Sequence, residues 1–219
     1  MKTRTHITGG AAAGFSLVEL MLVAAVLGLI VGSVAMLGRA GEQAYRTSAT
    51  AAHLEAQAAT TVERIVAELR IAGLATIAPD PIPGVGSDAI QYLQATGMTN
   101  GQVQWTTLRR LAFEYEAGEI DDGLDNNKNG LVDEGRVVLR EDFGGPAERP
   151  RVLTRWVREV AEGEVENGVD DDGDGLVDER GFFVERFGET LVVRLTLQRR
   201  DAEGRLLTRT ARTSVRSRN

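Results

Sequence analysis

Hydrophobic and polar positions divide the chain into a continuous apolar segment, a helical stripe and a β-rich remainder. From Leu20 to Gly38 no position carries a charge, and these 19 residues are nearly all apolar or small. That length suffices to cross a hydrocarbon core of roughly 30 Å. Lys2 and Arg4 precede the segment and no acid occurs in residues 1–14, which favours a single-pass membrane protein with a cytoplasmic N-terminus.

Beyond Arg39 the chain becomes polar but keeps apolar residues at steps of three and four, the spacing of one helix face. No proline occurs between Phe15 and Ala78, so we predict one helix over about residues 15–74. The first part, 15–40, is predicted to lie in the membrane. The second part, 41–78, is predicted to be periplasmic, and its apolar stripe should pack under a sheet. The stripe consists of Leu54, Ala58, Thr61 or Val62, Ile65, Leu69 and Ala72.

Residues 79–219 contain short alternating or apolar runs bounded by turn residues, the pattern of an antiparallel sheet. The predicted fold class is therefore α+β, with a long N-terminal transmembrane helix packed on an antiparallel β-sheet head. The predicted strands are 108–116, 137–140, 152–160, 182–187, 189–199 and 205–215.

Composition excludes several kinds of chemistry. The chain of 219 residues has no cysteine and only two histidines, His6 and His53, so thiol chemistry and a histidine-based metal site are excluded. The formal net charge of -7 argues against a nucleic-acid partner. No serine or cysteine nucleophile lies beside a histidine in the sequence, and we do not expect an enzyme.

Glu19 is an unusual residue for the start of an apolar segment, because an intramembrane acid costs about 3 kcal/mol and normally implies a partner. A cleaved secretory signal is the alternative interpretation, with Ser33-Val34-Ala35 as its small-residue site. The apolar run is longer than the roughly 7 to 15 residues usual for such signals, which favours an uncleaved anchor.

The stretch Gly14-Phe15-Ser16-Leu17-Val18-Glu19-Leu20-Met21 resembles the prepilin peptidase site of type IV pilins and type II secretion pseudopilins. The resemblance implies removal of leader 1–14 by cleavage after Gly14, and methylation of the new amine of Phe15. It also implies that Glu19 pairs with the N-terminal amine of a neighbouring subunit during assembly. Segments 44–47 and 68–73 resemble PilW-like minor pilins and J-type minor pseudopilins less specifically.

The family resemblance implies a structural subunit that primes or caps a type IV pilus or a type II secretion pseudopilus. Its partners would be the prepilin peptidase and other pilin or pseudopilin subunits, contacted through the N-terminal helix. It would reside in the bacterial inner membrane with a periplasmic head, 79–219, and then in the filament. A membrane-anchored calcium-binding adhesin that does not polymerise and, less favoured, a calcium-dependent hydrolase are the alternatives.

Two acidic segments repeat at an offset of 45 positions: residues 119–134, here named loop 1, and residues 164–179, named loop 2. Each fits the first half of a calcium loop, with side-chain oxygens at alternate positions and a glycine at the turn, Gly130 or Gly175. The pattern is similar to the calcium loops of dockerins and of bacterial acidic repeats. The sequence thus predicts two calcium sites, with ligands Asp125, Asn127, Asn129, Leu131 through its carbonyl and Asp133, and Asp170, Asp172, Asp174, Leu176 through its carbonyl and Asp178.

The loops depart from an EF-hand where its bidentate glutamate should be, since Arg136 and Gly181 occupy those positions. Val132 and Val177 are expected to point into the core. Solvated acidic turns are the alternative interpretation of both loops. Further oxygens for the two ions could come from Glu119, Asp121, Asp122 or Glu134, and from Glu164, Glu166, Asn167 or Glu179.

Overall fold

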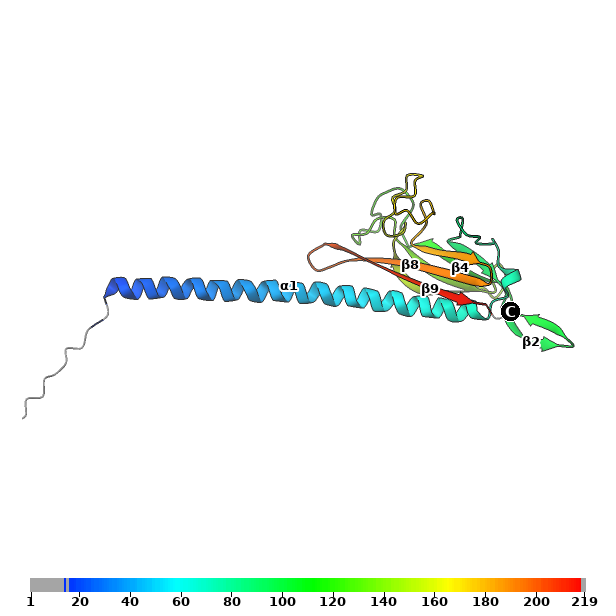
Figure 1. Cartoon of the computed structure of the whole chain (residues 1–219), viewed down its shortest axis with the longest axis horizontal. Coiled ribbons are helices and arrows are strands. Elements are labelled where there is room, and N and C mark those ends of the chain that lie inside the picture. Colours follow the sequence, from blue (N-terminus) through cyan, green and yellow to red (C-terminus); the bar gives the residue numbers. More distant parts are fainter. Residues whose placement is uncertain (1–13, 15, 218–219) are drawn as a thin grey trace, which may run out of the picture. The chain divides into compact units, whose positions relative to one another are not determined.

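The computed structural model describes residue 14 and residues 16–217; the leader positions 1–13 and Phe15 lie outside the described residues. The chain divides into two compact units between Tyr45 and Arg46. Helix α1 (Leu17–Arg70) begins in the first unit and ends in the second (Figure 1). Every residue from 16 to 46 is exposed, and α1 contains a stretch long and apolar enough to span a membrane.

The second unit has a core formed by one face of α1 and one face of a sheet. The buried residues of α1 are those of the predicted stripe, and Leu54, Ile65 and Leu69 are almost completely buried. They belong to the same apolar cluster as residues of the sheet, including Leu191 and Leu195. The predicted packing of the stripe under a sheet is confirmed.

Helix α1 ends at Arg70, four residues before the expected end of the helix. The backbone then pairs with residues 93–95: the N–H of Gly73 donates to Leu93 and the N–H of Ala95 donates to Ile71. A short 3₁₀ helix, η1 (Leu74–Thr76), follows. The helix ends early because the residues that follow Arg70 bond to a distant segment, which local periodicity does not reveal.

Seven strands form an antiparallel sheet, in the order β1-β4-β5-β6-β8-β7 with β9 also paired to β8 (Figure 1). All six predicted strands are present, to within a few residues at their ends. The sheet strands are β1 (Ala89–Tyr92), β4 (Arg109–Tyr115), β5 (Gly135–Glu141), β6 (Arg149–Val157), β7 (Phe182–Phe187), β8 (Thr190–Arg200) and β9 (Leu206–Arg216). Strand β1 and a separate hairpin of β2 (Ala95–Thr99) and β3 (Gln102–Trp105) were not predicted from the sequence.

The topology brings loop 1 and loop 2 to one edge of the sheet. Loop 1 connects β4 to β5, and loop 2 follows β6 and leads to β7. Strands β4 and β6 are both antiparallel to β5, so they run in the same direction and their carboxyl ends meet at the same edge. A hydrogen bond joins the ends of β4 and β6: the hydroxyl of Tyr115 donates to Glu159 Oε1 over 2.7 Å.

Candidate functional site

The proposed processing segment precedes α1 directly. Gly14 is exposed, Phe15 lies outside the described residues, and the carbonyl of Ser16 accepts a hydrogen bond from the N–H of Leu20 over 3.1 Å. Glu19 lies in the first turn of α1 and is exposed. A carboxylate at this end of a helix interacts favourably with the helix dipole, but in an apolar segment it still lacks the solvation of water.

Loops 1 and 2 have the same backbone frame, closed by an aspartate near the end of each loop. In loop 1, Asp133 accepts hydrogen bonds from the N–H groups of Asp122 and Gly123. In loop 2, Asp178 accepts them from the corresponding residues, 167 and 168, over 2.9 and 2.8 Å. The carboxylates of Asp133 and Asp178, predicted as cation ligands, therefore bond the start of each loop to its end.

A buried glutamate at the first position of each loop supports the turn. Glu119 accepts from the N–H groups of residues 126 and 127, and Glu164 accepts from those of residues 171 and 172. The residues are 5% and 1% exposed. Burial of a carboxylate is tolerated where several N–H groups bond to it. These two glutamates thus shape the loops in which the predicted ligands stand.

The first aspartate of each motif also bonds to the backbone. Asp125 accepts from the N–H groups of Asn129 and Gly130, over 3.1 and 2.8 Å. Asp170 accepts from those of Gly173 and Gly175, over 2.6 and 2.9 Å. The sequence repeat therefore encodes a backbone conformation as well as a set of oxygens.

The hydrophobic pair in each loop has the opposite orientation to that expected. Leu131 and Leu176 are both 5% exposed, whereas Val132 and Val177 are 45% and 55% exposed. The prediction that the valines point into the core is therefore wrong. Two positions after the valine, Glu134 of loop 1 and Glu179 of loop 2 are buried. In each loop the leucine and the glutamate are therefore directed inward, where the chain approaches the sheet.

Loop 2 concentrates acidic side chains around two clusters that share Asp172. Carboxylate oxygens of Glu164, Asp172 and Glu179 lie within 4.8 Å of one another, as do those of Asp170, Asp172 and Asp174. Oxygens at this separation can bind one hard cation such as calcium. From the sequence, Glu164 and Glu179 were only two of several residues that could supply further oxygens to a cation.

Arg194 is the one basic residue that forms ion pairs with the carboxylates of the loop 2 clusters, among the described residues. This residue of β8 bonds to Glu179 Oε1 over 2.6 Å and to Asp174 Oδ2 over 2.5 Å. Burial raises the pKa of Glu179, and the negative charges of Asp174 and Glu164 raise it further, whereas Arg194 lowers it. One oxygen of Glu179, Oε2, is buried without a hydrogen-bond partner. Sequence reasoning missed Arg194, because the alternation of β8 gives no sign of what faces it.

Loop 1 has a different arrangement around Glu134, the counterpart of Glu179. Oxygen Oε1 of Glu134 accepts hydrogen bonds from Nδ2 of Asn127, over 2.9 Å, and from Nδ2 of Asn129. Two neutral amides therefore contact the glutamate where loop 2 has the acids Asp172 and Asp174. The two loops are alike in backbone and differ in the charge that surrounds the buried glutamate.

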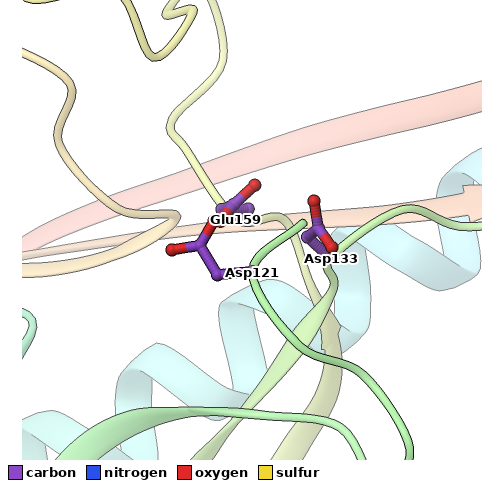
Figure 2. Close-up of side chains that lie close together, drawn as sticks. All are labelled: Asp121, Asp133 and Glu159. Carbon is purple, nitrogen blue, oxygen red and sulfur yellow. The ribbon is translucent and has the colours of Figure 1, made fainter. Parts of the chain in front are cut away.

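A third acidic cluster lies between the loops. Figure 2 shows Asp121 and Asp133 of loop 1 beside Glu159, which follows β6, and their carboxylate oxygens lie within 4.8 Å. Arg180 bonds to Glu159 over 2.6 Å and lies 3.5 Å from Asp121. Burial raises the pKa of Glu159, while Tyr115 and Arg180 lower it. The guanidinium of Arg180 already provides this cluster with a positive charge. The cluster therefore connects loop 1 to Glu159 and Arg180, the residues that flank loop 2.

Comparison of the chain with protein-family models, with curated proteins and with solved structures found no match.

Proposed function

We propose that this chain is a minor pilin or minor pseudopilin, a structural subunit that primes or caps a type IV pilus or a type II secretion pseudopilus. The observation that carries the proposal is the run from Gly14 to Glu19, which leads into the first turn of a helix with an exposed apolar first part. The second part of that helix packs on a sheet. A subunit of this kind needs all three features: a cleavage site, a helix for the membrane and filament, and a folded head.

In this proposal the prepilin peptidase removes residues 1–14 at the cytoplasmic face of the inner membrane. The basic residues Lys2 and Arg4 hold that end in the cytoplasm, which leaves the head in the periplasm. Glu19 then forms an ion pair with the free amine of Phe15 in a neighbouring subunit. An ion pair relieves the cost of an isolated charge among apolar groups, so assembly is favoured over the separate subunit in the bilayer.

The head of the proposed subunit is stabilised by calcium at loop 2. Carboxylates on an irregular loop suit calcium, which accepts six to eight oxygens in irregular geometry, better than magnesium, which requires a compact octahedron. Mutual repulsion among the acids of loop 2 is reduced when a divalent cation binds. Binding only to the folded head then raises its free energy of unfolding.

Intact mass and N-terminal analysis of the membrane-purified protein tests the proposal. The expected product begins at Phe15 and carries an N-methyl group, and it should be recovered in filaments or secretion complexes. A protein that retains residues 1–14 in a host with an active prepilin peptidase would instead favour a membrane-anchored adhesin. A product cut after Ala35 would identify the N-terminus as a secretory signal.

A further inference from the structure

The third and fifth positions of the motif present one oxygen to the backbone in both loops. In loop 1, Asn127 Oδ1 accepts the N–H of Asn129, and Asn129 Oδ1 accepts that of Leu131, over 3.0 and 2.9 Å. In loop 2, Asp172 Oδ1 and Asp174 Oδ1 accept the equivalent N–H groups, both over 3.0 Å. These bonds fix which atom of each side chain is left to face the buried glutamate.

The remaining atom is a donor in loop 1 and an acceptor in loop 2. The Nδ2 groups of Asn127 and Asn129 both donate to Glu134. In loop 2 the corresponding atoms are carboxylate oxygens, which cannot donate to Glu179 when ionised. In loop 1, amide dipoles thus stabilise the buried Glu134. In loop 2, further negative charge lies beside the buried Glu179.

The unpartnered oxygen of Glu179 lies in a residue that belongs to an acidic cluster. Glu179 is 3% exposed, and its Oε2 has no hydrogen bond although Glu164 and Asp172 present oxygens to the same cluster. Oε2 of Glu134 also lacks a partner, but no cluster of three acids includes Glu134 in the part of the chain that the structure describes.

The two loops also differ in net charge, and loop 2 is the more negative. Loop 1 has six acidic residues and Lys128, whereas loop 2 has eight acidic residues and no basic one. Arg194 pairs with Glu179 and Asp174. Arg158 donates to Glu164 only at its backbone carbonyl, and the carboxylates of Glu164 and Asp172 have no ion-pair partner among the described residues. A divalent ion at these two residues and Glu179 would complete the charge balance that Arg194 begins.

We propose that loop 2 alone binds calcium, through Glu164, Asp172 and Glu179, and that loop 1 is a cation-independent copy in which the amides of Asn127 and Asn129 replace the ion. This inference rests on the calcium part of the proposed function. It replaces the two ions expected from the sequence by one. Loop 1 then stabilises the head with or without calcium, whereas the stabilisation by loop 2 depends on calcium.

Calcium titration of the full-length chain in detergent micelles, after removal of metal with chelator, tests the proposal. The wild type should bind one ion, and calcium at a hundredfold excess over Kd should raise its melting temperature by about 5 °C or more. Glu179→Gln should abolish both effects. The matched change in loop 1, Glu134→Gln, should leave one ion bound and the calcium-induced shift in melting temperature intact.

Exchange of the distinguishing residues provides a test that does not depend on loss of function. Asn127→Asp with Asn129→Asp should create a second ion site and lower the melting temperature in chelator. The reverse change, Asp172→Asn with Asp174→Asn, should abolish ion binding and yield a head that is equally stable in chelator and in calcium.

Two bound ions in the wild type, one of them lost in Glu134→Gln, would overturn this inference and leave the calcium part of the proposed function standing. A wild-type chain that binds no ion would overturn both. Neither result bears on processing at Gly14, which the mass of the N-terminus decides separately.

Discussion

Arg194 bonds to Glu179 over 2.6 Å and thereby ties loop 2 to strand β8. The side chains are 10% and 1% exposed, so the pair is removed from water. The guanidinium of Arg194 therefore gives loop 2 a counter-charge on the sheet. Several measurable consequences depend on this pair and on the other contacts of the two loops.

Replacement of Arg194 by glutamine should destabilise the head more in chelator than in calcium. Loss of one partner from a buried ion pair costs about 3 kcal/mol or more, because the remaining charge is left without compensation. A bound cation would supply part of that compensation. Chemical denaturation in chelator and in calcium measures the difference. Arg212→Gln is the matched control, since Arg212 is the exposed cross-strand neighbour of Arg194 and should have little effect.

Asp125→Ala and Asp170→Ala should have different dependence on calcium. Asp125 accepts two backbone N–H groups, so its loss should cost about 1–2 kcal/mol with or without the ion. Asp170→Ala should also remove negative charge from loop 2, which partly relieves the chelated state and reduces the calcium-dependent stabilisation. Melting curves in both conditions test this contrast, and equal calcium responses of the two variants would contradict it.

Gly14→Glu should block removal of the leader, because the peptidase must approach the backbone at the scissile bond and a side chain obstructs it. The variant should accumulate at the mass of the full-length precursor. Gly10→Glu, which places the same side chain within the leader, is the control and should be processed. Normal cleavage of Gly14→Glu would remove the basis of the family assignment.

Glu19→Ala should insert into the membrane as well as the wild type or better, since removal of a charge eases transfer into the bilayer by up to about 3 kcal/mol. Incorporation into filaments should fall sharply because the charge proposed to pair with the neighbouring amine is lost. Membrane fractionation and recovery of sheared filaments measure the two effects separately. Glu55→Ala, an exposed charge removed farther along α1, should leave both unchanged.

Acid sensitivity of the β8–β9 turn should depend on Asp201. Burial alone would raise the pKa of Asp201, but hydrogen bonds from Arg205 and Thr47 hold it below the ordinary value of 3.8. A carboxyl with a lowered folded-state pKa stabilises the fold above its unfolded value, and this contribution is lost as the pH falls through the folded value. Asp201→Asn should therefore lower stability at pH 7 and flatten the loss below about pH 4. Denaturation from pH 7 down to pH 2 measures both, and an unchanged acid limb would count against this role.

The sequence alone determined the helix stripe, six of the strands and the position of both acidic loops. Those features depend on local periodicity, which is set by 3.6 residues per turn in a helix and by alternation in a strand. The short strands β1, β2 and β3 were missed because they carry too few residues for a periodic pattern to emerge. The early end of α1 at Arg70 was missed for a different reason, since the backbone there bonds to residues 93–95.

Within the loops the sequence determined which residues are repeated, and only the tertiary structure decided what each repeated oxygen contacts. Asp133 and Asp178 bond to their own loop backbones, and Val132 and Val177 face outward. The inward direction of Glu134 and Glu179 is set by the strand that each loop enters. Arg194 reaches Glu179 from a strand that follows loop 2 in the chain, and no local pattern encodes such a contact, because it exists only once the sheet has assembled.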